Sequence, residues 1–135
     1  MLSRVAAVSF GVADLLTGAL VGGGVFVALP GRWWPVDVPA ALLVALELSA
    51  GVALLARTGW AERLARTACV VALSLGLSTV TLLAVTASWL SGVYGPVGRG
   101  GAIVLALVGL LALPYVVVLP AVQLVWLRPR SRPHP

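Results

Sequence analysis

Four long apolar runs constrain the fold of this sequence more than any other feature. They cover about residues 5–29, 39–57, 60–90 and 100–127. A helix needs about 20 residues to cross a hydrocarbon core of about 30 Å, and each run comes close to or exceeds that length. We therefore predict an all-α fold, namely a polytopic membrane protein with a bundle of four transmembrane helices.

The composition excludes most other classes of protein. Hydrophobic residues make up 61% of the 135 residues and charged residues 10%, against about 45–50% and 25% in soluble domains. A soluble chain of this length has too much surface for its volume to hide so many apolar side chains. The net charge of +5 comes from nine arginines between the apolar runs. Such arginines mark membrane topology, so we expect no nucleic-acid partner.

Helix breakers separate the runs. The segment 30–35 holds two prolines and a glycine and ends the first run. Asp37 followed by Pro39 predicts the start of the second helix, with Asp37 as N-cap. The segment 91–98, rich in glycine, predicts a loop between the third and fourth helices. The segment 128–135 is predicted to be a basic cytoplasmic tail.

The arginines give the bundle an orientation. Four spans place the N-terminus, the middle loop and the C-terminus on one side of the membrane. That side carries Arg4, Arg57, Arg63, Arg66, Arg128, Arg130 and Arg132, and the other side carries Arg32 and Arg99. Because positive residues concentrate on the cytoplasmic side, we expect a multi-pass protein of the cell inner membrane with both termini in the cytoplasm.

Two carboxylic acids, Asp14 and Glu47, lie within the apolar runs. An Asp at the centre of a membrane helix costs about 2.5–3.5 kcal/mol, so such acids face protein or water and often carry function. Asp14 is ten residues from Arg4 and Glu47 is ten residues from Arg57. At about 1.5 Å per residue, both acids lie about 15 Å from the arginine-rich boundary. The alternative is that they only join helices through hydrogen bonds.

The faces of the first two helices suggest where these acids point. Asp14 shares a helical stripe with Gly11, Gly18 and Gly22, and Glu47 shares a face with Gly51. Small residues allow close helix contacts in membranes. We therefore expect both acids to face other helices and Gly18 and Gly22 to contact one.

A tyrosine in the fourth run completes the candidate site. Tyr115 follows Pro114, where we expect a kink, with a second proline at Pro120. Hydroxyl residues of the third run form one polar stripe, which includes Ser74 and Ser78. The alternatives are a packed aromatic for Tyr115 and hydroxyls bonded to their own helix. The candidate catalytic or binding residues are Asp14, Glu47 and Tyr115, in a polar layer at mid-membrane.

Part of the second run resembles a known family. The segment Leu46-Glu47-Leu48-Ser49-Ala50-Gly51, its apolar continuation and the following Arg63 resemble the second helix of DoxX-type membrane proteins. The resemblance covers about a quarter of the chain. It implies a four-helix bundle and a link to quinone-dependent oxidoreductase systems, with a role for Glu47. Small multidrug resistance transporters are also four-span chains with one acid in the middle of their first helix. They are usually shorter, and some insert in both orientations with little charge bias, whereas this chain has a clear arginine bias and a second acid, Glu47.

Three functional hypotheses follow. The protein is an accessory subunit or binds a small lipophilic ligand. It is, alternatively, a membrane enzyme using acid–base chemistry on a lipophilic, isoprenoid-like substrate, or a small proton-coupled transporter. The sequence does not decide whether it is an enzyme. With one cysteine, Cys69, and one histidine, His134, we expect no metal and no cofactor. The expected partners are the lipid bilayer, a lipophilic small molecule, and a membrane protein or further copies of this chain.

Overall fold

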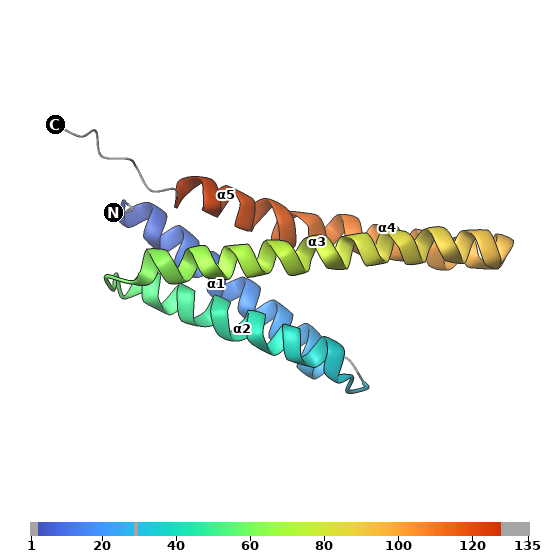
Figure 1. Cartoon of the computed structure of the whole chain (residues 1–135), viewed down its shortest axis with the longest axis horizontal. Helices are drawn as coiled ribbons and strands as arrows, with labels where there is room; N and C mark the ends of the chain where they lie inside the picture. Colours follow the sequence, from blue (N-terminus) through green and yellow to red (C-terminus); the bar gives the residue numbers. More distant parts are fainter. Residues whose placement is uncertain (1–2, 29, 128–135) are drawn as a thin grey trace. The chain divides into compact units, whose positions relative to one another are not determined.

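The computed structural model describes residues 3–28 and 30–127, and all regular elements in them are helical (Figure 1). The elements in order are α1 (Arg4–Gly23), the π-helix η1 (Gly24–Ala28), α2 (Trp34–Leu55), α3 (Ala61–Val93), α4 (Gly95–Leu113), the π-helix η2 (Pro114–Val118) and α5 (Leu119–Trp126). The all-α fold is confirmed.

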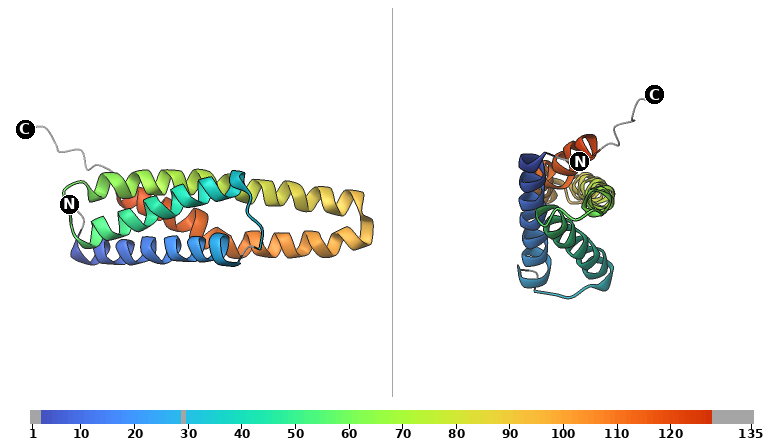
Figure 2. Two further views of the ribbon diagram at one scale, coloured as in Figure 1. Left: turned by 90° about the horizontal axis from the view of Figure 1, so that it is seen from below. Right: turned by 90° about the vertical axis from the view of Figure 1, so that its left-hand side faces the viewer.

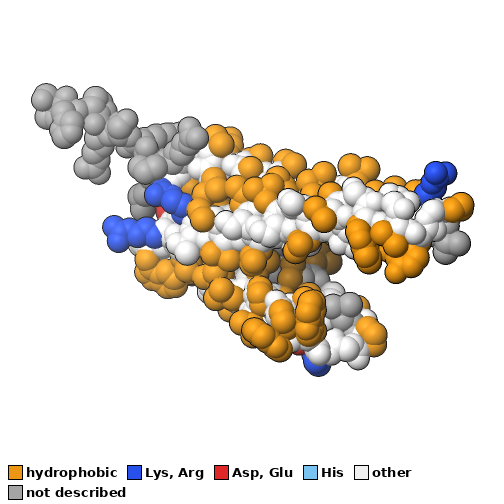
Figure 3. Space-filling model, turned by 45° about the vertical axis from the view of Figure 1, so that its right-hand side comes forward, with side chains coloured by type: hydrophobic (Ala, Val, Ile, Leu, Met, Phe, Trp, Pro, Cys, Tyr) orange, Lys and Arg blue, Asp and Glu red, His pale blue; other side chains and the backbone are white. Residues whose placement is uncertain are grey.

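Four helical stretches are long and apolar enough to cross a membrane. They are Arg4–Ala28, Trp34–Leu55, Ala61–Val93 and Gly98–Trp126. Hydrophobic side chains are spread over the helices on the visible face, and arginines lie at the ends of helices (Figure 3). This distribution suits a lipid environment, where apolar side chains need not be hidden. The chain is a multi-pass membrane protein of the four-helix class, as predicted.

The helices form two compact units, which are Met1–Val71 with Val122–Pro135, and Ala72–Ala121. In the first unit, α1 and α2 form an antiparallel pair that the start of α3 and the end of α5 join (Figure 1). Its core consists mainly of small side chains: Ala50, Ala53, Leu54, Ala61, Ala65, Ala68, Cys69 and Leu127. Small side chains let the helix backbones approach each other closely.

The second unit is a helical hairpin of α3 and α4 (Figure 2). The loop expected at residues 91–98 is largely absent, because α3 continues to Val93 and α4 begins at Gly95. Gly95 has φ +55°, a conformation that glycine adopts without strain. A β-carbon on Gly98 would overlap the carbonyl oxygen of Leu90. These two glycines allow a far tighter turn than the sequence predicted.

The second helix begins earlier than predicted, at Trp34 and not at Pro39. Trp33 is the N-cap residue, so Asp37 is not the N-cap. Instead Asp37 lies in the first turn, and its Oδ2 accepts a hydrogen bond of 3.1 Å from the backbone N–H of Trp33. Asp37 lies four residues after Trp33, one position beyond the acid of a capping box, and its carboxylate satisfies the N–H of the N-cap residue. Pro39 lies inside α2, five residues after its first residue, where it cannot donate to the helical hydrogen-bond ladder.

The fourth span changes its helical form at the expected place. Pro114 begins the π-helix η2, and the N–H of Leu119 bonds to the carbonyl of Pro114, five residues back. Proline lacks an N–H and disrupts the regular ladder, and π-turns are one way for a helix to absorb such a disruption. Pro120 lies in α5. Leu29 and the tail, including Arg128, Arg130 and Arg132, lie outside the described residues.

Candidate functional site: a buried acid cluster in the first unit

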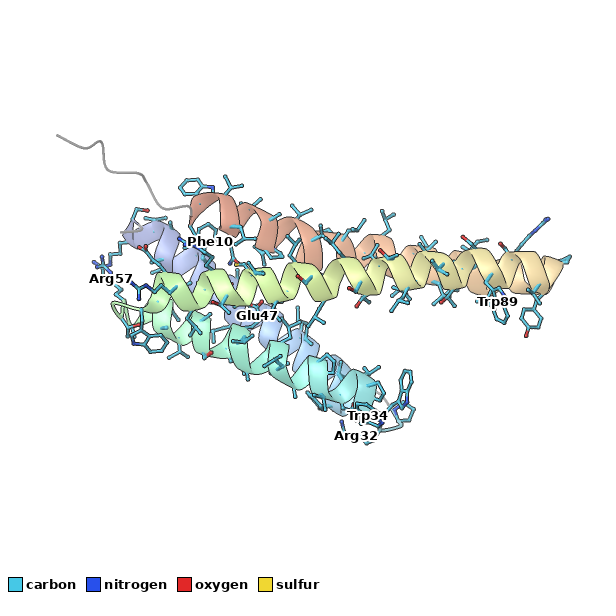
Figure 4. The ribbon with its side chains drawn as sticks, viewed as in Figure 1. Phe10, Arg32, Trp34, Glu47, Arg57 and Trp89 are labelled. Atoms are coloured by element: carbon cyan, nitrogen blue, oxygen red, sulfur yellow. The ribbon has the colours of Figure 1, made fainter. Side chains whose placement is uncertain are left out.

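The first unit buries both membrane acids. Asp14 of α1 is 1% exposed and Glu47 of α2 is 5% exposed, and Glu47 lies midway along α2 (Figure 4). The two carboxyl groups are close enough for their charges to interact. The expectation that both acids face the interior of the protein is therefore confirmed.

Glycines set the distance between α1 and α2. A β-carbon on Gly18 would lie 3.3 Å from Cβ of Glu47 and 3.0 Å from Cδ2 of Leu48. A β-carbon on Gly22 would lie 3.6 Å from Cγ1 of Val44. Both expected glycine contacts are therefore present. Gly18 is one turn beyond Asp14, so the two acids differ in depth by about one turn, or roughly 5 Å.

A chain of hydrogen bonds links Asp14 to two other helices. The amide Nε2 of Gln123 in α5 donates to Oδ1 of Asp14 over 2.6 Å. The thiol of Cys69 in α3 donates to Oε1 of the same amide over 2.8 Å. Gln123 is 3% exposed and Cys69 is 2% exposed. The resulting Cys69–Gln123–Asp14 trio joins α3, α5 and α1 within the first unit.

The hydrogen-bonding capacity of the two acids is not filled. Oδ2 of Asp14 is buried and has no hydrogen-bond partner. Among residues 3–28 and 30–127, no side chain donates a hydrogen bond to Glu47 and no arginine pairs with either acid. A buried polar atom without a partner costs about 1–3 kcal/mol. The carboxyl oxygens of the cluster can therefore accept a hydrogen bond from a further donor or pair with a positive charge.

Contacts at the arginine-rich end hold the trio in place. A nitrogen of the Arg66 guanidinium donates to the backbone carbonyl of Leu127, which ties α3 to the end of α5. The rings of Phe10 and Trp126 meet edge to face, with centroids 6.3 Å apart. These contacts fix the ends of α1, α3 and α5 next to the residues that form the hydrogen-bond chain.

Tyr115 does not belong to this buried cluster. It lies on η2 in the second unit, and 58% of its side chain is exposed. Ser74 and Ser78 are also exposed and lie in the second unit. The hydroxyl of Ser78 donates to the carbonyl of Ser74 over 2.8 Å, as hydroxyls in apolar helices commonly do. The expected placement of Tyr115 and these serines in one buried layer with the acids is not supported.

Sequence reasoning missed Gln123 and treated Cys69 only as a lone cysteine. One signal was available for Gln123, because it is the single glutamine of a chain that has no asparagine, and it lies within an apolar run. A side-chain amide in a membrane span needs a partner, because lipid offers none. For Cys69 no comparable signal existed, because a free cysteine packs in an apolar core as a small hydrophobic residue without any polar partner.

The residue types limit what the cluster can do. No group of three or more His, Cys, Asp or Glu in the described part of the chain could hold a metal ion. Two carboxyls, an amide and a thiol can exchange protons and bind donors or cations. No protein-family model, curated protein or solved structure matches this chain.

Proposed function

We propose that this integral membrane protein binds a small lipophilic ligand with a basic head group at Asp14 and Glu47. One observation carries the proposal: the two carboxyls are buried close together, and no described cation pairs with either. An uncompensated charge inside a membrane is costly, so such acids gain most from a proton or a cation. The ammonium of a lipophilic amine would supply both a positive charge and donors for the free Oδ2 of Asp14.

Exposed apolar side chains near the acids support a ligand with an apolar tail. On α1 they include Leu16 and Leu20, and on α2 Leu48. The polar end of the ligand would meet the acids, and its tail would lie along these side chains.

Binding is tested with dodecylamine and dodecanol as probes of equal chain length. A ligand that binds only the folded protein stabilises it, by about 2.7 kcal/mol at 100 times its dissociation constant. We expect dodecylamine to raise the melting temperature in detergent micelles and dodecanol not to do so. The effect should be lost when Asp14→Asn and Glu47→Gln are combined.

The matched control is Glu62→Gln, which removes a carboxyl in the first turn of α3, outside the buried cluster. This variant should keep the full response to dodecylamine. Equal stabilisation by the amine and the alcohol, or an unchanged response in the double variant, would contradict the proposal. If the protein is instead a proton-coupled transporter, the acids should release a proton when the ligand binds. A pH-sensitive dye measures this release.

A second function, that of an accessory subunit, is favoured by the trio itself. Its hydrogen bonds join α1, α3 and α5, as polar groups do when they hold membrane helices together. One form of this function is the role that the DoxX resemblance implies, beside a quinone-dependent oxidoreductase. In this case the Asp14→Asn protein should support wild-type quinone reduction in membranes, whereas removal of the whole chain should abolish it. Unchanged quinone reduction without the chain would rule this role out.

The proposed location is the cell inner membrane with both termini in the cytoplasm. Within the first unit, Arg4, Arg57, Arg63 and Arg66 lie where α1 begins, α2 ends and α3 begins. Figure 4 shows Arg57 at the turn between α2 and α3, and Arg32 at the opposite end of α2. The excess of arginine at one end favours that end as the cytoplasmic one.

A further inference from the structure

The amide of Gln123 occupies a special position in the buried trio. It has one donor side, which faces Asp14, and one acceptor side, which faces the thiol of Cys69. Its two neighbours can exchange roles. A carboxylate only accepts a hydrogen bond whereas a carboxylic acid also donates one, and a thiol can donate or accept. The trio can therefore be hydrogen-bonded in two ways.

With Asp14 ionised, the bonds run as the structure has them, from the Cys69 thiol to Oε1 and from Nε2 to Oδ1 of Asp14. With a proton on Oδ1, Asp14 must donate, so it needs an acceptor in place of the N–H₂ group. A rotation of the Gln123 amide by about 180° supplies that acceptor, since the two ends of an amide have nearly the same shape. The N–H₂ group then donates to the sulfur of Cys69.

We propose that Gln123 couples the protonation of Asp14 to the hydrogen bond of the Cys69 thiol by rotating its amide. The proton comes from water and binds to Oδ1 of Asp14, and no other covalent bond changes. This inference goes beyond ligand binding, because it holds with or without a ligand. Gln123 is a positioning residue in it, and Cys69 reports the state of the acid.

The surroundings of Asp14 leave Gln123 as the group that must respond. The residues that face the acid from the neighbouring helices are Glu47 on α2, Cys69 on α3 and Gln123 on α5. Oδ2 of Asp14 is buried and without a partner. A proton on Oδ2 would therefore be a buried donor without an acceptor among the described residues, which is costly. A proton on Oδ1 is favoured, because the Gln123 amide bonded there can rotate and accept its hydrogen bond.

Infrared spectroscopy of the full chain in lipid vesicles tests this coupling as a function of pH. Cys69 is the only cysteine, so the S–H stretching band belongs to it alone, which Cys69→Ala confirms. We expect the S–H band to shift at the pH at which the carboxylic acid band of Asp14 appears. Asp14→Asn should abolish both the acid band and the shift of the thiol band.

Two further variants separate coupling from general changes of the protein. Gln123→Leu keeps a side chain of similar size but removes both bonds, so the thiol band should no longer follow pH. Glu47→Gln should keep the shift of the thiol band, although the pH at which it occurs can change. Circular dichroism checks that each variant remains helical.

Three results would overturn the inference. The first is a thiol band that does not move while the Asp14 band titrates. The second is a thiol band that still follows pH in both Asp14→Asn and Gln123→Leu. The third is an Asp14 band that stays constant over the whole pH range in which the protein is folded. If either Asp14→Asn or Gln123→Leu does not fold, the other variant still tests whether the thiol band depends on the hydrogen-bond chain.

Discussion

Gly51 of α2 faces Gly11 of α1 so closely that a β-carbon on Gly51 would lie 2.7 Å from the carbonyl oxygen of Gly11. The same β-carbon would lie 2.8 Å from Cγ of Leu15. This contact lies next to the buried acids, so the two backbones set the spacing of α1 and α2 at the cluster. An added side chain there must push the helices apart.

Gly51→Ala is therefore expected to destabilise the protein by about 1–3 kcal/mol, the range for overpacking a tight contact. Thermal unfolding in detergent, followed by circular dichroism, measures the loss. Gly23→Ala is the matched control, because a β-carbon at Gly23 meets nothing within 4 Å. The control should be neutral or gain up to about 1 kcal/mol from the loss of a flexible residue. Equal behaviour of the two variants would argue against the contact.

The Gln123–Asp14 hydrogen bond predicts a coupling between two substitutions. Gln123→Leu leaves a buried acid with no donor, which should cost about 1–3 kcal/mol. Asp14→Leu leaves the Gln123 amide without its acceptor and should cost a similar amount. Replacing both partners with apolar groups is less costly than the sum of the single changes. The measurement is a double-mutant cycle in unfolding free energy, and strictly additive effects would show that the bond contributes nothing.

The backbone conformation of Arg57 predicts that glycine is more stable than alanine at this position. Arg57 is the one residue other than glycine with positive φ in the described chain, at φ +55°. It follows the C-cap Ala56, where the N–H of Thr58 bonds to the carbonyl of Ala53 over 3.2 Å. Glycine is favoured at such a position because it has no β-carbon. Arg57→Gly should therefore be about 1 kcal/mol more stable than Arg57→Ala, a comparison in which both variants lose the charge. Thermal unfolding gives the difference, and a less stable glycine variant would contradict this account.

The topology makes a prediction for reporter fusions. A reporter joined after the last residue should be active only if it is a cytoplasmic one, and a reporter inserted at Tyr94 only if it is a periplasmic one. The reason is the excess of arginine on the side of both termini. A periplasmic signal from the C-terminal fusion would reverse the orientation. Signals from the same side for the two fusions would contradict four spans, because the last span lies between them.

The sequence by itself determined the fold class, the number of spans and the burial of Asp14 and Glu47. These follow from local properties: the length of an apolar run, and the cost of a carboxyl in lipid, which turns an acid toward protein. The glycines on the same stripe as Asp14 indicated which face meets α2. The weaker predictions concerned boundaries. At Asp37 the capping bond was assigned to the wrong position, and at residues 91–98 glycines were taken for a loop when they allow a tight turn.

Only the tertiary structure decided which residues join the acids. Gln123 lies 109 positions from Asp14, and nothing local to either residue links them. In a membrane protein the lipid is as apolar as the protein core, so the hydrophobic pattern of α5 does not mark the face that meets α1. Ser78 is exposed because its hydroxyl bonds within its own helix and needs no buried partner. Tyr115 is exposed as well, and no local signal in the sequence marked it as such. Which polar residues pair across helices depends on how the helices pack, and this packing exists only in the folded chain.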